Sequence, residues 1–184
     1  EGKFLVRLGD DYLSWNQIQV VWDSGSYDYY GRPVEGKLSN INMTVNANEW
    51  SHIAVTFGEK TIKVYVNGVE KGSSTTNVPS SVNFGIAHND EQGTRITRCF
   101  WVGYSYEHAR YFPGMMSELR IWNRVLTADE LANATRRYGV DPKSEGLVTY
   151  WKCDEGQGDV IKDYTSYRND LASDGLKWEP VSLP

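Results

Sequence analysis

Two short runs of alternating apolar and polar residues constrain the fold of this chain more than any other feature. They lie in the segment WSHIAVTFGEKTIKVYVNG, and each has an apolar residue at every second position, the period at which side chains of a β-strand share a face. Asn67-Gly68 ends the second run and is the preferred pair for a two-residue turn with positive φ at both positions. The sequence therefore predicts strands over 51–57 and 61–66 and a third strand over 69–75.

The rest of the chain predicts more short strands and one helix. Further strands are expected at 4–8, 17–22, 82–86, 98–104, 114–122 and 147–153, with one short strand within 37–45 and a strand or extended tail at 177–183. Thr127, followed three residues later by Glu130, is typical of a capping box and predicts a helix from Thr127 to Arg137. Many short strands and one late helix indicate an all-β fold, a two-sheet antiparallel jelly-roll sandwich.

Composition excludes two classes of partner. The chain has 184 residues, enough for one domain with a sizeable core, and a net charge of −5 with no stripe of Lys and Arg. This charge gives no electrostatic basis for nucleic-acid binding. No run approaches the roughly 20 apolar residues of a membrane span. The seven Trp and twelve Tyr favour sheets and also suit a recognition surface.

The two cysteines, Cys99 and Cys153, both fall in predicted core strands. The favoured interpretation is that they are small buried apolar residues, because unpaired cysteine packs well in cores. The alternative is a disulfide, which would imply an oxidising compartment.

Three quoted motifs carry a resemblance to a known family. The strand WSHIAVTF, the hairpin ending VNG and the segment GMMSELRIWNRVLT resemble the laminin-G-like branch of the concanavalin A-like lectin/glucanase superfamily. The corresponding family patterns are W-x-H-(I/V)-A-V-T-(F/Y), V-(N/D)-G and G-x-(I/M)-D-E-(L/V)-R-(I/V)-(W/Y)-N-R-x-L-(S/T). The resemblance implies the jelly-roll fold. It also implies a domain that binds carbohydrate, binds protein or serves as a passive module beside a catalytic domain.

The C-terminal segment LVTYWKCDEGQGDVIKDYT resembles a stretch that opens many domains of this family. Here it closes the chain, with Cys153 in place of the usual Phe and Tyr167 at the start of the part that corresponds to G-N-x-N. This arrangement resembles that of exported multidomain proteins of polysaccharide-degrading bacteria. The family's first strands are not found before Glu1, so residues 1–184 are interpreted as a single domain lacking its first strands, a fragment of a longer exported protein with neighbouring domains.

A catalytic role is not predicted. Retaining glucanases of this superfamily carry E-x-D-x-x-E on one strand, which sets two carboxylates about 5–5.5 Å apart. The chain has no such motif; Asp154 and Glu155 are adjacent and point to opposite faces, and Glu118 is isolated. We therefore expect no catalytic residue in this chain, and a glycoside hydrolase is the weakest of the functional hypotheses.

Calcium is the one cofactor that the resemblance raises, since related domains often hold a calcium ion at a sandwich edge through carboxylates and carbonyls. Ser117 stands where the family has an Asp ligand, which weakens this case. The remaining candidate ligands are acidic residues: Glu118, Asp154, Asp159 and Asp163. The favoured alternative is a solvated acidic loop in which Asp and Gly supply turns.

Sugar binding needs aromatic rings for the apolar sugar faces together with hydrogen-bonding side chains. Two segments supply both, and the candidate residues are Trp22, Tyr29, Tyr30, Arg32, Trp101, Tyr104, Tyr106 and His108. The leading hypothesis is a non-catalytic carbohydrate-binding module of a secreted or cell-surface polysaccharide-processing protein, with a glycan as its partner. The alternative is a structural or protein-interaction spacer beside a catalytic domain.

Overall fold

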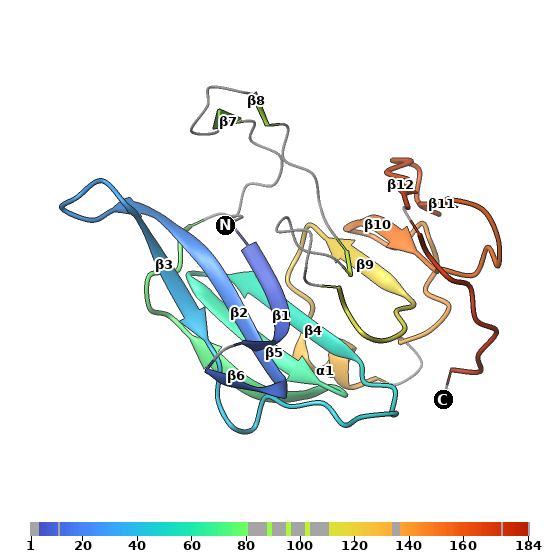
Figure 1. Cartoon of the computed structure of the whole chain (residues 1–184), viewed down its shortest axis with the longest axis horizontal. Helices are drawn as coiled ribbons and strands as arrows, with labels where there is room; N and C mark the ends of the chain where they lie inside the picture. The colour runs from blue at the N-terminus through green and yellow to red at the C-terminus, as the bar shows by residue number, and fades with distance from the viewer. Residues whose placement is uncertain are drawn as a thin grey trace. The chain divides into compact units, whose positions relative to one another are not determined.

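The computed structural model describes residues 4–10, 12–80, 88–89, 95–96, 102–103, 111–133, 137–173 and 175–183 (Figure 1). The predicted strands 82–86 and 98–104 lie outside these residues, apart from 102–103. The described elements are β1 (Phe4–Asp10), β2 (Leu13–Tyr27), β3 (Pro33–Leu38), β4 (Ile53–Gly58), β5 (Thr61–Val66), β6 (Val69–Ser74), β7 (His88–Asn89), β8 (Arg95–Ile96), β9 (Leu119–Trp122), α1 (Ala128–Ala132), β10 (Leu147–Trp151), β11 (Val160–Ile161) and β12 (Leu171–Ala172). The predicted all-β class with antiparallel sheets and one short helix is confirmed.

Contacts along the chain divide it into two compact units. The first comprises Glu1–Thr44, Phe57–Ile62 and Gly72–Gly114, and the second comprises Val45–Thr56, Lys63–Lys71 and Met115–Pro184. The first contains the sheet β1-β2-β3, and the second contains the pairs β9-β10 and β11-β12; β4-β5-β6 form a further three-stranded sheet.

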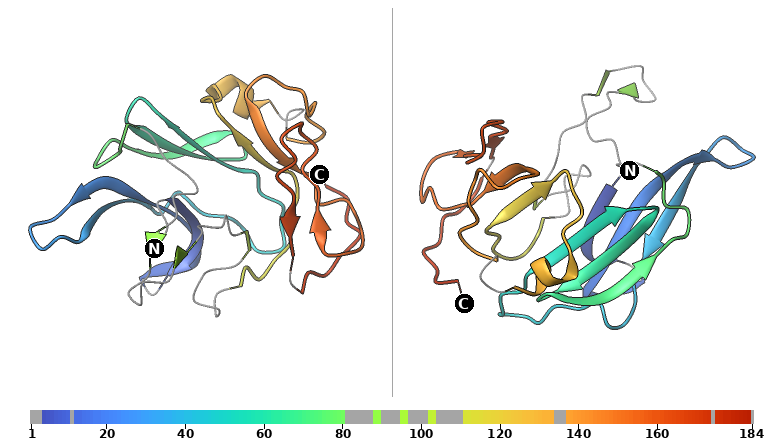
Figure 2. Two further views of the ribbon diagram at one scale, coloured as in Figure 1. Left: turned by 90° about the horizontal axis from the view of Figure 1, so that it is seen from above. Right: turned by 180° about the vertical axis from the view of Figure 1, so that it is seen from behind.

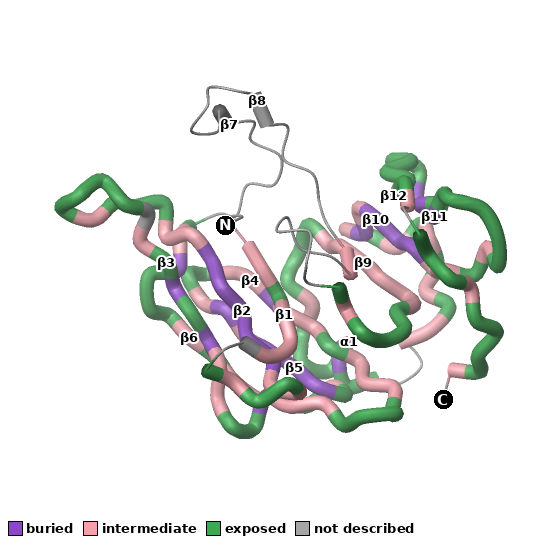
Figure 3. Tube along the Cα trace, viewed as in Figure 1, coloured by how far each residue is buried: buried purple, intermediate pink, exposed green. Residues whose placement is uncertain are grey.

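The sheet β1-β2-β3 is built around a run of buried residues in β2. Five consecutive residues from Ile18 to Trp22 are buried, so both faces of this strand are covered at its centre (Figure 3). Val20 is paired with Val6 and Leu38, and Trp22 with Phe4 and Gly36. The strand predicted at 17–22 is therefore correct but too short. Within the described residues, β2 pairs only with β3 beyond Trp22, and the two strands extend as a hairpin to Tyr27 and Pro33 (Figure 2).

The two alternating runs form the predicted hairpins. β5 has the predicted bounds, and Ile62, Val64 and Val66 are buried as the alternation requires. Asn67 and Gly68 have φ values of 51° and 81°, which is the positive pair that a two-residue hairpin turn of this type needs. The turn at 59–60 is of the same kind, with φ values of 49° and 57°.

Single residues with positive φ shorten two predicted strands in the second unit. The strand expected from 114 begins only at Leu119, because Glu118 has a φ of 58° and cannot continue an extended backbone. β10 ends at Trp151 rather than 153, with Cys153 at a φ of 61°. The segment 177–183 has no regular strand, so of the two predicted alternatives it is the extended tail.

The helix has the predicted start but not the predicted end. Thr127 caps α1, its side chain accepts a hydrogen bond from the Glu130 backbone, and the Glu130 side chain accepts one from the Thr127 backbone. The predicted end at Arg137 is wrong: α1 ends at Ala132, where Asn133 takes an extended backbone with ψ of 105°. Asn133 favours this end, because asparagine is a poor helix former whose side chain competes for backbone hydrogen bonds.

Candidate functional site

The turn that joins β2 to β3 is organised by one carboxylate. Asp28 Oδ1 accepts hydrogen bonds from the backbone N–H groups of Tyr30 and Arg32, both at 2.9 Å, and Oδ2 accepts one from Arg32 Nε at 2.9 Å. The backbone closes the loop as well: Asp28 N–H donates to Arg32 O and Gly31 N–H donates to Asp28 O. Short polar side chains that bond to backbone groups ahead of them are what fix turns of this kind.

The same contacts favour the ionised form of the Asp28 carboxylate. The hydrogen bond from the Arg32 backbone is the largest influence, and it lowers the pKa of Asp28 below its ordinary value together with the Arg32 side chain and the Tyr30 backbone. Asp28 is therefore ionised at neutral pH, and the turn keeps its internal ion pair. Asp28 is not among the predicted site residues, although an Asp three residues before a Gly in a polar loop is a recognisable turn signal.

Three tyrosines surround this turn and face solvent. Tyr29 is 95% exposed, Tyr30 is 75% exposed, and Tyr27 at the end of β2 is also exposed. The rings of Tyr29 and Tyr30 meet edge to face with centroids 5.2 Å apart, and the Arg32 guanidinium lies 5.1 Å from the Tyr30 centroid. We call residues 27–32 the tyrosine hairpin tip. It presents aromatic faces, phenol hydroxyls and a guanidinium on a backbone that the Asp28 contacts hold in place.

Trp22, the other predicted sugar-binding aromatic of this region, is not part of that surface. Its exposed fraction is 0%, and its indole Nε1 donates a hydrogen bond to Asn77 O at 2.9 Å. Gly36, its neighbour on β3, leaves room for the ring, because a Cβ there would overlap the Trp22 indole. The assignment of Trp22 to a binding surface is therefore wrong: a tryptophan in the middle of a sheet covered on both faces belongs to the core.

Gly36→Ala is expected to lower the free energy of unfolding by about 2–3 kcal/mol, because an overpacked core must shift the Trp22 ring or the strand. Chemical denaturation measures this value, and Lys37→Ala, on the exposed neighbouring position of β3, serves as the control. Equal stability of the two variants would contradict the packing of Trp22 against Gly36.

The second predicted aromatic cluster, formed by Trp101, Tyr104, Tyr106 and His108, lies outside the described residues, so its role in sugar binding stays a prediction.

The acidic metal candidates do not assemble into a site. Asp163 is fully buried, and its carboxylate accepts four hydrogen bonds: Oδ1 from Tyr150 N–H and Thr165 N–H, and Oδ2 from Thr165 Oγ1 and Asn169 N–H, at 2.9–3.0 Å. These contacts occupy both of its oxygens, so Asp163 is a structural residue rather than a metal ligand.

Two of the other acidic candidates are engaged by tyrosines. Glu118 Oε2 accepts a hydrogen bond from the Tyr150 hydroxyl at 2.6 Å, and Asp154 Oδ1 accepts one from the Tyr164 hydroxyl at 2.8 Å. The bond to Asp154 raises the pKa of Tyr164 to about 12. Asp159 is exposed. Across the part of the chain that the structure describes, no three His, Cys, Asp or Glu side chains come together as a metal site.

Glu118 and Asp154 nevertheless line one hollow of about 510 Å³, together with Lys152, Cys153 and Trp178. The Lys152 ammonium lies 4.2 Å from the centroid of the Tyr164 ring. Cys153 is a free cysteine in the described part of the chain, and Cys99 lies outside it. Burial is the main influence that raises the pKa of the Cys153 thiol to about 12, so it is protonated and a poor nucleophile at neutral pH.

His52 is held neutral in the second unit. Burial, and then the positive charges of Arg120 and Arg137, lower its pKa from 6.5 to about 4. Its backbone is tied to the turn: His52 N–H donates to Asn67 Oδ1 and His52 O accepts from Asn67 N–H. These contacts make His52 a structural residue of the turn.

We expect the free energy of unfolding to fall as the pH drops from about 6.5 to about 4. In that window His52 binds a proton in the unfolded chain but stays neutral in the folded chain. Between pH 7 and pH 5 the loss from this residue is on the order of 1–2 kcal/mol. Urea denaturation of the unaltered chain and of His52→Gln at both pH values tests this. An equal loss in the variant would show that His52 is not the group responsible.

Comparison with known proteins gives one family and two solved structures. A family model described as the concanavalin A-like lectin/glucanases superfamily matches residues 1–132. A candidate carbohydrate-binding protein from Bacteroides ovatus ATCC 8483 is similar in structure, with a TM-score of 0.66 and 26% identity over 100% of this chain and 48% of that chain. These findings confirm the predicted concanavalin A-like fold.

The second solved structure is an S-layer domain-containing protein of Clostridium thermocellum ATCC 27405, with a TM-score of 0.33 and 24% identity over 63% of this chain and 50% of that chain; the likeness is too low to support an argument. No curated protein matches the chain. The chain thus spans about half the length of the solved structures to which it is similar.

Proposed function

The chain belongs to the concanavalin A-like lectin/glucanases superfamily, and from this membership we propose that it is a non-catalytic carbohydrate-binding module whose glycan contacts the tyrosine hairpin tip. The observation that carries the proposal is the pair of solvent-exposed tyrosines, Tyr29 and Tyr30, on a turn fixed by Asp28. Exposed aromatic side chains that gather on one ordered turn form the kind of surface patch that marks interaction sites. The structural likeness to a candidate carbohydrate-binding protein points to a sugar.

The chemistry of the tip suits a saccharide. A sugar ring has an apolar face of C–H groups that packs on an aromatic ring, and its rim of hydroxyls needs donors and acceptors. Tyrosine offers both a ring and a hydroxyl, and it loses little conformational entropy on binding because it has only two side-chain torsions. Since the Asp28 hydrogen bonds already order the loop, binding does not have to order it again.

Our proposal of a non-catalytic module rests on the partners of the acidic residues. Glu118, Asp154 and Asp163 each accept hydrogen bonds within the protein. Asp163 is buried, and Glu118 and Asp154 are committed to tyrosine hydroxyls. A retaining or inverting hydrolase needs one carboxylic acid to deliver a proton and a second carboxylate to attack or to activate water; the hydrogen bonds of Glu118, Asp154 and Asp163 speak against those roles for these three carboxylates.

The setting of the module is also a proposal. We infer that it serves a longer secreted or cell-surface protein that processes polysaccharide and that it works beside neighbouring domains of that chain. In the described residues there is no helix that is long and apolar enough to cross a membrane. Calcium remains a proposed ligand only, because its candidate residues are not grouped in the described structure.

A glycan-array screen of the folded chain, with calcium and again with a chelator, tests the proposal. We expect reproducible retention of a glycan, and retention that survives the chelator would mean that binding needs no calcium. A blank array in both conditions would overturn the proposal and favour the alternative, a spacer or protein-docking domain whose associated activity lies elsewhere in the longer protein.

A further inference from the structure

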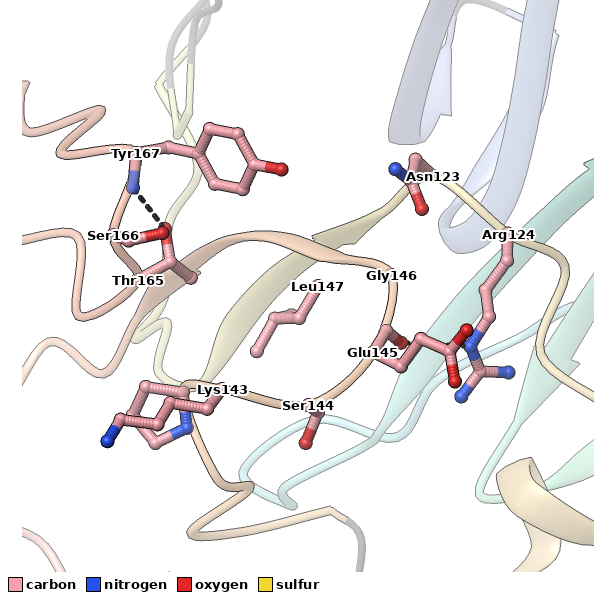
Figure 4. Close-up of a pocket in the computed structure, with 11 residues that line it drawn as sticks. Asn123, Arg124, Lys143, Ser144, Glu145, Gly146, Leu147, Thr165, Ser166 and Tyr167 are labelled. Carbon is pink, nitrogen blue, oxygen red and sulfur yellow. Dashed lines mark hydrogen bonds between the residues drawn. The ribbon is translucent and has the colours of Figure 1, made fainter.

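The second unit contains an open hollow that none of the predicted site residues lines. Its volume is about 420 Å³, and three segments surround it: 123–124, 142–147 and 165–167 (Figure 4). Ligand pockets in proteins commonly measure about 300–1,000 Å³, so the hollow is at the small end of that range. All three segments belong to the second unit, whereas the tyrosine hairpin tip belongs to the first.

One wall of the hollow is fixed by hydrogen bonds from Arg124. Its Nη1 and Nη2 donate to both carboxylate oxygens of Glu130, at 2.9 and 2.8 Å, and its Nε donates to Glu145 O at 3.1 Å. The backbone N–H of Asn123 donates to Gly146 O at 2.8 Å. Gly146 has a φ of 82°, and a Cβ there would come within 2.9 Å of Arg124 Cγ, so the close approach of these two segments requires glycine.

The other wall is the turn that carries Tyr167. The buried Asp163 carboxylate accepts the Thr165 N–H, and Thr165 Oγ1 in turn accepts the Tyr167 N–H at 3.3 Å. The Tyr167 side chain is 60% exposed. Figure 4 shows its ring on one side of the hollow, with Asn123 and Arg124 on the other side and Leu147 between them. An exposed ring is thus held by a turn that is anchored in the core.

The polar groups at the rim are available and carry little net charge. Among the described residues, no hydrogen bond engages the Asn123 carboxamide or the Tyr167 hydroxyl. The charge of Arg124 is paired with that of Glu130, and Lys143 and Glu145 add one charge of each sign beside the hollow, so neither a cation nor an anion is favoured. Leu147, which is buried, supplies an apolar floor. An aromatic ring, an apolar floor and an amide that both donates and accepts match the C–H face and the hydroxyls of a neutral sugar.

We propose that this hollow is a second saccharide subsite, separate from the tyrosine hairpin tip, in which one neutral sugar residue packs on Tyr167 and hydrogen-bonds to Asn123. The inference rests on the proposed function, since it assigns a further contact to the same class of ligand. Two separate subsites on one module would let it hold two stretches of polysaccharide and gain avidity.

Calorimetric titration of the full chain with cellohexaose, laminarihexaose, xylohexaose and mannohexaose tests the subsite. The variants are Tyr167→Ala, Tyr167→Phe and Tyr29→Ala with Tyr30→Ala; Tyr12→Ala is the matched control, because Tyr12 is 94% exposed in a different turn. We expect two binding events in the unaltered chain. Tyr167→Ala should weaken one of these two binding events about tenfold, whereas Tyr167→Phe should retain that event. The variant with both Tyr29→Ala and Tyr30→Ala should retain the same event and lose the other one.

The possible failures are distinguishable. If Tyr167→Ala binds every hexasaccharide as the unaltered chain does, while the double hairpin variant loses all binding, the subsite is overturned and the proposed function stands. If the double hairpin variant binds normally and Tyr167→Ala loses binding, the subsite in the hollow is supported and the proposed site at the tyrosine hairpin tip is overturned. If none of the hexasaccharides binds the unaltered chain, the subsite is overturned together with neutral-glycan binding.

Discussion

Replacing Tyr29 and Tyr30 together by alanine should abolish glycan binding at the tyrosine hairpin tip and leave the fold intact. The two rings make up most of the aromatic surface of the tyrosine hairpin tip, and truncating a central aromatic contact typically costs about 2 kcal/mol or more. At this tip we therefore expect at least a hundredfold weaker binding of the glycan selected by the array, since about 1.4 kcal/mol corresponds to a factor of ten.

The melting temperature separates this result from simple unfolding. Both side chains are solvent-exposed, and substitutions at such positions usually change stability by about 0.5 kcal/mol or less. For a domain of this size that corresponds to roughly 1–2 °C. Tyr12→Ala, which removes an equally exposed tyrosine from the β1–β2 turn, should leave both binding and melting temperature unchanged. A large drop in the melting temperature of the double variant would mean that the rings support the fold.

Asp163→Asn is expected to lower the free energy of unfolding by about 3 kcal/mol. The carboxylate accepts four hydrogen bonds in a buried position, and an asparagine has only one acceptor oxygen. Its amide nitrogen would face donors, so buried N–H or O–H groups lose their partner, at about 1–3 kcal/mol each. Chemical denaturation provides the measurement, and Asp159→Asn, an exposed carboxylate on the same segment, is the control with an expected change of about 0.5 kcal/mol or less.

Lowering the pH should cause part of the same loss in the free energy of unfolding, because it protonates Asp163. Burial alone would raise the pKa of Asp163, but the hydrogen bonds from Tyr150, Thr165 and Asn169 outweigh it and lower the pKa below its ordinary value. A lowered pKa means that the stabilisation is complete above about pH 4 and is lost as the pH falls through the folded-state value. If Asp163→Asn and Asp159→Asn were equally stable, the carboxylate would not be the anchor of the 163–169 turn.

Local patterns in the sequence predicted the elements whose causes are local. Alternation in 61–66, the pair Asn67-Gly68 and the capping residue Thr127 each act through near neighbours, and the structure confirms all three. The long β2 hairpin was missed because its outer half, rich in Ser, Gly and Tyr, looks like a loop. It is a strand because β3 pairs with it across the bulge between Asp23 and Tyr27.

The candidate site was harder to predict because exposure depends on contacts between distant segments. Trp22 and Tyr29 look alike as aromatics near one loop, yet Gly36 and Asn77 enclose the first and nothing described encloses the second. Asp163 was proposed as a metal ligand, but its partners include Tyr150 on another strand. The sequence around Asp163 did contain a local signal for its structural role: an Asp two residues before Thr165 is a common source of side-chain to backbone hydrogen bonds.

The most direct test of the account is an NMR titration of the isotopically labelled chain with the oligosaccharide retained most strongly on the array, following the backbone amide signals. We predict saturable shifts at residues 27–32, with the largest at Tyr29 and Tyr30. Saturable binding that leaves these signals unmoved, or the absence of saturable binding, would contradict the claim that the tyrosine hairpin tip is the carbohydrate-binding surface.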